Sequence, residues 1–173
     1  MNEKRVNVEK LKKCVRAPLK NSVKEEEAWR FYDITNCYSY AIGMFFDIDF
    51  LKPGEISDME LKSQYTDEDI LERVVKDLEC LGLEVTKSTL EEKVEGDDTW
   101  KIAVMNTGLR NVTTVYDYHF LKQGANMLWY HKRPYDQFPS NYDSRHRVIN
   151  NPETAVFAFD YHLVAYLSVR FKK

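Results

Sequence analysis

The sequence predicts a single α+β domain in which helices pack on a central antiparallel sheet. Two observations lead to this prediction. Helix-like patterns occupy the first half of the 173-residue chain, whereas strand-like runs follow one another in the second half. The length fits one domain of about 100–200 residues and argues against two large ones.

The sign of the net charge changes along the chain, and this change marks a boundary more clearly than any linker-like segment does. Residues 1–24 carry eight basic and two acidic side chains, whereas residues 25–98 carry seven basic and 21 acidic ones. We therefore expect a basic N-terminal arm, 1–24, followed by a single domain, 25–173. No nucleic-acid-binding motif accompanies the arm, so we expect it to lean on the acidic middle of the chain. The acidic region 25–98 could also face a basic protein partner.

Hydropathy and cysteine content predict a cytoplasmic protein without a membrane or nucleic-acid partner. No run reaches the roughly 18–20 apolar residues of a membrane span. The first 24 residues lack the apolar segment of a secretory signal peptide, which leaves only a non-classical route of secretion. Three cysteines are too few for a disulfide framework and fit a reducing compartment.

The first predicted helix covers Cys37–Phe45. Thr35 or Asn36 can cap its start, because their side-chain oxygens accept from unpaired backbone N–H groups. A long loop, 49–64, follows this helix.

The clearest helix is expected over Asp67–Leu81. Thr66 is its predicted N-cap, and Asp69 completes a pair that resembles a capping box. An apolar stripe runs along the segment, and Gly82 stands where a helix commonly ends.

The second half of the chain predicts an antiparallel sheet. Leu83–Ser88 alternates like a strand, and Trp100–Met105 is a buried strand. Val112–Leu121 and Met127–Lys132 are joined by a short glycine-containing loop, which favours a hairpin. His162–Phe171 is the last predicted strand.

Cys37 is the candidate nucleophile among the three cysteines. It lies in the first turn of a predicted helix, where unpaired backbone N–H groups and the helix dipole favour a thiolate. We therefore expect the pKa of this thiol to be lowered. Cys14 lies in the charged arm, and Cys80 lies near the end of a helix, where the dipole disfavours an anion.

Two histidines, His119 and His131, are the candidate partners of this thiol. They lie 12 residues apart on the two arms of the predicted hairpin, so they can sit across from one another near its open end. One imidazole could contact the thiol while the other holds its tautomer. Tyr38 and Trp129, beside these residues in sequence, are candidate substrate contacts, although core packing is the more common role of such aromatics.

Three segments resemble the NlpC-like superfamily of papain-fold cysteine peptidases and amidases, which are mostly bacterial. They are Asn36-Cys37-Tyr38-Ser39-Tyr40-Ala41, Asp117-Tyr118-His119-Phe120 and Trp129-Tyr130-His131-Lys132. The resemblance covers about residues 30–135, although the residues around the first histidine are bulkier than is usual in the family.

This resemblance implies a papain-like fold and an amide-cleaving hydrolase with a Cys-His-His triad. Cys37 would be the nucleophile that forms a thioester acyl-enzyme, His119 the general base and acid, and His131 the orienting residue. The substrate would be a peptide or a muropeptide-like molecule, and the reaction would require no cofactor or metal.

Two alternatives stay open on the sequence. The chain could be a non-catalytic binding protein on the same fold, in which Cys37 simply packs. It could also bind zinc through Cys37, His119 and His131, although no closely spaced ligand pair such as CxxC or HxxxH occurs.

Overall fold

The computed structural model describes residues 6–16, 35–44, 50–136 and 138–173. Five antiparallel strands form one sheet in the order β1-β5-β2-β3-β4. The strands are β1 (Leu83–Ser88), β2 (Thr99–Asn106), β3 (Tyr118–Gln123), β4 (Trp129–Tyr130) and β5 (His162–Phe171). The last strand of the chain thus lies between β1 and β2, and the predicted α+β class is confirmed.

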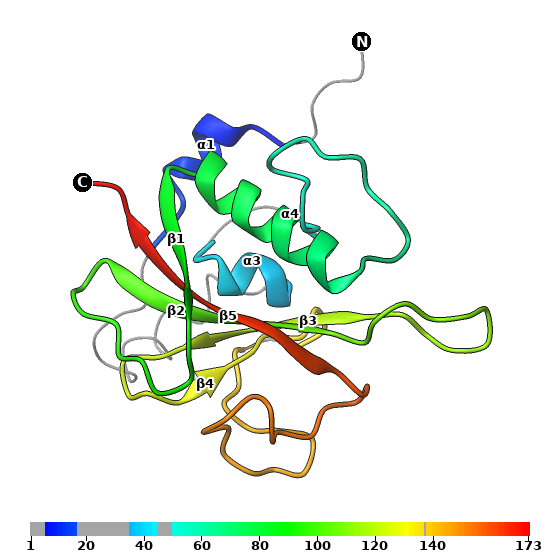
Figure 1. The fold of residues 1–173 in the computed structure, drawn as a ribbon. Coiled ribbons are helices and arrows are strands. Elements are labelled where there is room, and N and C mark those ends of the chain that lie inside the picture. The colour runs from blue at the N-terminus through cyan, green and yellow to red at the C-terminus, as the bar shows by residue number, and fades with distance from the viewer. Residues whose placement is uncertain (1–5, 17–34, 45–49, 137) are drawn as a thin grey trace.

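Helices cover one face of this sheet, and a long loop covers the other (Figure 1). The helices are α1 (Val8–Lys12), α3 (Cys37–Ala41) and α4 (Asp67–Cys80). The segment between β4 and β5 forms the loop on the opposite face. Within the described ranges, no helix has the length and apolar character needed to cross a membrane.

The two faces of the sheet bury separate cores. The main core lies between the helices and the sheet and includes Tyr38 and Phe120. The second core lies on the other face and includes Leu121 and Trp129. Successive residues of β3 therefore point into different cores, as the alternation of a strand requires.

The helix α4 and the strands that flank it follow the sequence prediction closely. The side chain of Thr66 accepts from the backbone N–H of Asp69 at 3.1 Å, which confirms the predicted N-cap. The helix ends at Cys80, one residue before the predicted end, and Gly82 follows with φ of 80°. The bounds predicted for β1 and β5 are also confirmed.

Helix α3 and the hairpin strands are shorter than predicted, whereas β2 extends one residue beyond the predicted Trp100–Met105 at each end. The α3 helix ends at Ala41, because Gly43 turns the chain with φ of 84° and Met44 forms a β-bridge with Val15. A Cβ atom on Gly43 would lie 2.5 Å from the carbonyl oxygen of Arg16, so the chain approaches itself too closely for another residue.

The predicted hairpin is present between β3 and β4, with a shorter ladder than expected. The strand predicted from Val112 begins at Tyr118, and the preceding residues form an exposed loop with Val112 and Val115 in solvent. The apolar character of that segment therefore did not mark a strand.

The described part of the N-terminal arm belongs to the main core. Val6, Leu11 and Val15 are buried there, and Asn7 caps α1 by accepting from the backbone N–H of Lys10. This segment is anchored by apolar burial rather than by charge alone. The proposed boundary between residues 24 and 25 lies outside the described residues.

Candidate active site

Cys37 is the first residue of α3, and a capping box fixes the start of this helix. The Asn36 side chain accepts from the backbone N–H of Ser39 at 2.9 Å, and the Ser39 hydroxyl accepts from the backbone N–H of Asn36 at 3.0 Å. The Asn36 amide also donates to the carbonyl of Leu51 at 2.7 Å. The backbone around Cys37 is therefore held on both sides.

Helix α3 packs on β3. Strand β4 is short and covers just part of the edge of β3. The rings of Tyr38 and Phe120 lie 4.8 Å apart at this contact. β4 pairs with Lys122 and Gln123, so among the residues that the structure describes the first half of β3 has no ladder partner on that side. The thiol of Cys37 faces the backbone amide of Phe120 at this edge.

The structure brings His119 and His131 into direct contact. The ladder pairs Lys122 with Tyr130, so Leu121 lies opposite His131 and His119 is its diagonal neighbour on the same face. The Nε2 atom of His119 lies 2.7 Å from Nδ1 of His131, and the two rings are nearly perpendicular at 88°.

A carbonyl group determines the tautomer of both rings. His131 Nε2 lies 3.0 Å from the carbonyl oxygen of Tyr142, and a carbonyl can only accept. In the neutral ring the proton of His131 is therefore on Nε2, and its Nδ1 accepts from the Nε2–H of His119. The free lone pair of His119 is therefore on Nδ1, and a general base needs such a lone pair.

Burial keeps both histidines neutral. It lowers the pKa of His119 well below its ordinary value, and the nearby charges of His131 and Arg133 lower this pKa further. Burial also lowers the pKa of His131, although the hydrogen bond to the Tyr142 carbonyl opposes this shift. At neutral pH both rings therefore match the tautomers assigned above.

The expected lowering of the Cys37 pKa is wrong. Burial raises the pKa of this thiol to about 12, and the backbone amide of Phe120 opposes this shift only in part. The carboxylate of Asp117 raises the pKa further. A helix start with exposed amides would favour the thiolate, but this thiol is only 7% exposed, so desolvation prevails.

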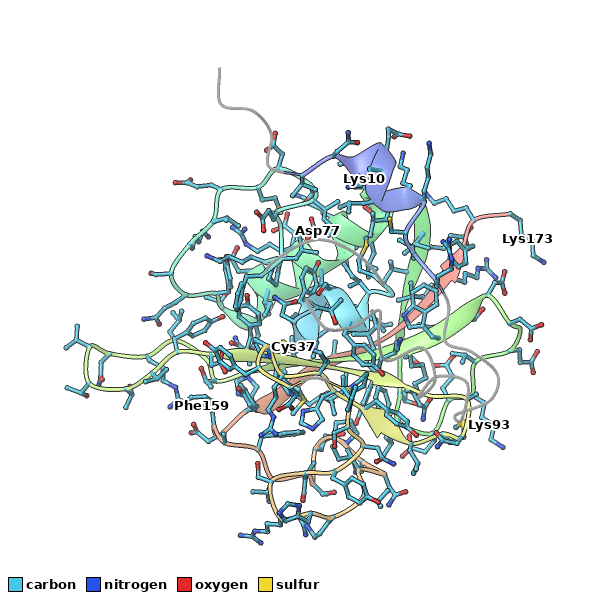
Figure 2. All side chains as sticks on the ribbon, turned by 180° about the vertical axis from the view of Figure 1, so that it is seen from behind. Lys10, Cys37, Asp77, Lys93, Phe159 and Lys173 are labelled. Atoms are coloured by element: carbon cyan, nitrogen blue, oxygen red, sulfur yellow. The ribbon has the colours of Figure 1, made fainter. Side chains whose placement is uncertain are left out.

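Cys37, His119 and His131 all line one pocket of about 930 Å³. In Figure 2, Cys37 lies near the centre of the molecule, where α3 meets the sheet. Aromatic side chains form much of the wall, and basic side chains contribute to it as well. The aromatic residues include Tyr65, Tyr116, Tyr118, Phe157, Phe159 and Tyr161, and the basic ones include Lys52, Lys62 and Arg133.

Tyr38 and Trp129, the candidate substrate contacts, are fully buried and do not line this pocket. The Tyr38 hydroxyl donates to Asp77 at 2.8 Å and so ties α3 to α4. Trp129 packs in the second core against Tyr166. Their positions assign both side chains to the core rather than to the pocket wall.

Sequence reasoning missed the part of the site that lies after β4. Asp143 follows Tyr142, and its carboxylate accepts from the backbone N–H groups of Arg145, Arg147 and Val156. The guanidinium of Arg147 also donates to it at 2.8 Å. An Asp four residues before an Arg in a polar loop is a weak sequence signal, so the sequence did not single out Asp143.

Lys132 is a second missed residue. Its side chain is fully buried, and its ammonium donates to the carbonyl of Thr35 at 2.7 Å. Lys132 follows His131, and Thr35 lies two residues before Cys37, so this bond joins the two halves of the site. A lysine in a predicted strand is usually at the surface, which is why its role was not foreseen.

The zinc alternative has no geometric support in the described part of the chain. No three His, Cys, Asp or Glu side chains gather there as a metal site requires. His119 and His131 also direct a nitrogen of each ring at the other, so those two atoms are committed to a hydrogen bond.

Comparisons with known proteins returned no match. Neither a protein-family model, nor a curated protein, nor a solved structure is similar to this chain at a significant level. The arrangement of the described residues is therefore what bears on the function.

Proposed function

We propose that the protein is a thiol-dependent hydrolase, a peptidase or amidase, in which Cys37 is the nucleophile. His119 would be the general base and acid, and His131 would orient it. One observation carries the proposal: the hydrogen bonds from His119 through His131 to the Tyr142 carbonyl leave the free lone pair of His119 on Nδ1, and His119 lines the same pocket as Cys37.

The pKa directions favour one form of this mechanism. The thiol and the imidazole are both neutral before reaction, because burial raises the pKa of Cys37 and lowers that of His119. His119 Nδ1 would therefore take the proton while the sulfur attacks the carbonyl carbon. His131 would stabilise the resulting imidazolium by accepting from its Nε2–H.

The later steps return the proton. His119 donates it to the leaving amine as the tetrahedral intermediate collapses to a thioester on Cys37. Water, activated by the same imidazole, then hydrolyses the thioester and regenerates the thiol. The backbone N–H groups of Cys37 and Tyr38 face the sulfur, and the N–H of Cys37 is a donor for the oxyanion.

The substrate class follows from the chemistry and from the pocket. A neutral thiol–imidazole pair suits an amide or ester carbonyl, and the aromatic wall suits a peptide or muropeptide-like chain. A helix carrying the thiol against an antiparallel strand that carries the histidine supports a papain-like arrangement. The order Cys, His, His along the chain supports it as well.

The proposal is tested by acetylation of the protein with p-nitrophenyl acetate, followed by peptide mass spectrometry. We expect the wild type to form an acetyl thioester on Cys37 and to release it by hydrolysis. Cys37→Ala should abolish this turnover, and His119→Ala should reduce it by about 10²–10⁴-fold. Cys80→Ala is the matched control, because Cys80 is exposed and distant in sequence from the site.

Two results would contradict the proposal. One is turnover that persists in Cys37→Ala, and the other is a wild-type Cys37 that reacts no faster than the same thiol in the unfolded chain. Either would remove the reason to regard the histidine pair as a base.

The raised pKa of Cys37 favours a second candidate, a non-catalytic binding pocket on the same fold. In that case the thiol packs against β3, and the aromatic pocket holds a ligand without cleaving it. The acidic region 25–98 would then be the natural contact for a basic protein partner. A folded protein whose pocket binds peptide, with no acetylation of Cys37, would support this candidate over the hydrolase.

A further inference from the structure

Tyr118 lies directly before His119 on β3 and points to the other face of the sheet. Its ring lies 5.7 Å from Phe120 and 6.2 Å from Tyr65, on the side of the main core. Cys37 belongs to that same core. Tyr118 and His119 therefore leave the strand in opposite directions, yet both line the pocket with the thiol.

The hydroxyl of Tyr118 makes no hydrogen bond to any residue that the structure describes, and its oxygen is not closed off from solvent. Two other tyrosines differ in this respect, whereas the hydroxyl of Tyr116, which also lines the pocket, is buried without a partner among the described residues. The hydroxyl of Tyr161 donates to Asp117, and that of Tyr38 donates to Asp77. Tyr118 thus presents an uncommitted donor to the pocket.

This phenol remains a donor across the physiological pH range. Burial raises the pKa of Tyr118 far above its ordinary value, and negative charge on Cys37 has the next largest effect in the same direction. The hydroxyl therefore keeps its proton and responds to charge that develops at the thiol.

From this geometry we infer that Tyr118 is a catalytic residue of the proposed hydrolase and forms the side-chain half of its oxyanion hole. Its hydroxyl would donate a hydrogen bond to the carbonyl oxygen of the substrate while Cys37 attacks the carbonyl carbon. The backbone N–H of Cys37 would donate the other bond, from α3. The inference rests on the proposed function.

The step is balanced without any transfer of the Tyr118 proton. The sulfur forms a bond to the carbonyl carbon, and the carbonyl π electrons move onto oxygen. The thiol proton moves to Nδ1 of His119. Tyr118 only stabilises the new negative charge, so its substitution should slow reactions that create an oxyanion and spare those that do not.

Two reactions of the same thiol separate these cases. Acetylation by p-nitrophenyl acetate passes through a tetrahedral oxyanion, whereas alkylation by iodoacetamide is a displacement at saturated carbon and forms none. In Tyr118→Phe the ring is kept and only the hydroxyl is lost. We expect acetylation of Cys37 to slow by about 10²–10³-fold, while alkylation of Cys37 stays close to the wild-type rate.

Tyr166→Phe is the matched control. Tyr166 is a buried tyrosine of the second core, away from the pocket, so both reactions should keep their wild-type rates. Circular dichroism checks that Tyr118→Phe retains the fold.

The outcomes distinguish the two proposals. Acetylation of Tyr118→Phe at the wild-type rate overturns the role of Tyr118 and leaves the hydrolase intact. An equal loss of acetylation and alkylation also overturns it, because the hydroxyl would then act on the thiol itself. A wild type that is alkylated but never acetylated at Cys37 overturns the hydrolase, and with it this role.

Discussion

Two buried aspartates, Asp77 and Asp143, support the two halves of the site from opposite faces of the sheet. Asp77 on α4 accepts from the hydroxyl of Tyr38, and Tyr38 follows Cys37. Asp143 follows Tyr142, whose carbonyl accepts from His131. The Asp77 carboxylate thus holds the neighbour of Cys37, and the Asp143 carboxylate anchors the loop that carries the Tyr142 carbonyl.

The donors around the two carboxylates differ. Asp77 accepts from the backbone N–H groups of Gly54 and Ser57 and from the Ser57 hydroxyl, at 2.6–2.7 Å. No Lys or Arg of the described ranges forms an ion pair with Asp77. Asp143, in contrast, pairs with the guanidinium of Arg147.

The pKa values of the two carboxyl groups are consequently shifted in opposite directions. Burial raises the pKa of Asp77, even though its hydrogen bonds oppose the shift. Burial also acts to raise the pKa of Asp143, but the hydrogen bonds from Arg147, Val156 and Arg145 together outweigh it and lower the pKa. The candidate nucleophile is therefore supported by a carboxyl group without a cationic partner in the described ranges, and the histidine pair by a carboxylate that pairs with Arg147.

The largest effect is expected from Asp77→Ala. This change removes the common acceptor of four buried or half-buried donors, and an unsatisfied buried donor costs about 1–3 kcal/mol. We expect the free energy of unfolding to fall by about 3 kcal/mol or more, measured by urea denaturation. Asp77→Asn keeps one acceptor oxygen and puts an NH2 group in place of the other, so it should lose less than Asp77→Ala. An equal loss in both variants would show that the carboxyl oxygens are not the support.

Asp143→Asn should act on the site more than on the whole fold. The amide cannot pair with Arg147 as a carboxylate does, so the loop that carries Tyr142 loses its anchor. A displaced Tyr142 carbonyl releases His131, and we expect the acetylation rate of Cys37 to fall by roughly tenfold or more. Unchanged acetylation would separate Asp143 from the histidine pair. Asp160→Asn is a suitable control, because Asp160 is an exposed partner of Arg110.

A smaller effect is expected from Tyr38→Phe. The ring continues to pack on Phe120, while Asp77 loses one of its donors. The free energy of unfolding should fall by about 1 kcal/mol, as for a single hydrogen bond. In a double-mutant cycle with Asp77→Ala, which removes the acceptor, additive losses would contradict the bond between the two side chains.

The smallest expected effect is a difference in how the contributions of Asp77 and Asp143 to stability change with pH. The pKa of Asp143 is lowered in the folded protein, so its stabilisation is present above 3.8, the ordinary value, and is lost as the pH falls below it. The pKa of Asp77 is raised, so its contribution is most favourable below 3.8 and declines as the pH rises through its raised pKa.

Limited proteolysis with pepsin tests this difference, because the enzyme works in acid. As the pH falls below 3.8, cleavage should begin in the loop 140–157 around Asp143 before it begins in the loop 52–60 around Asp77. Cleavage in the reverse order would contradict the assigned shifts.

Local patterns were enough to predict much of the fold. Thr66 and Gly82 mark the ends of α4 because capping is decided by neighbouring residues. The strand His162–Phe171 was also predicted with its observed bounds. The hairpin spacing of His119 and His131 led to two rings that now form a hydrogen bond.

Non-local contacts account for what was missed. The early end of α3 depends on the approach of Arg16 to Gly43, and the tautomer of His131 depends on the carbonyl of Tyr142. The raised pKa of Cys37 results from burial by the whole fold. No window of sequence around these residues contains that information.

The bond from Lys132 to the carbonyl of Thr35 spans 97 residues of the chain. During synthesis, a chain that ends before Lys132 already contains Cys37 and His119 but lacks the tether and the carbonyl of Tyr142. Contacts of such long range form late in folding, because the closure of a long loop is entropically costly. Assembly of the candidate pair therefore requires synthesis through Tyr142, so a shorter nascent chain carries the Cys37 thiol without the bonds that orient the two histidines.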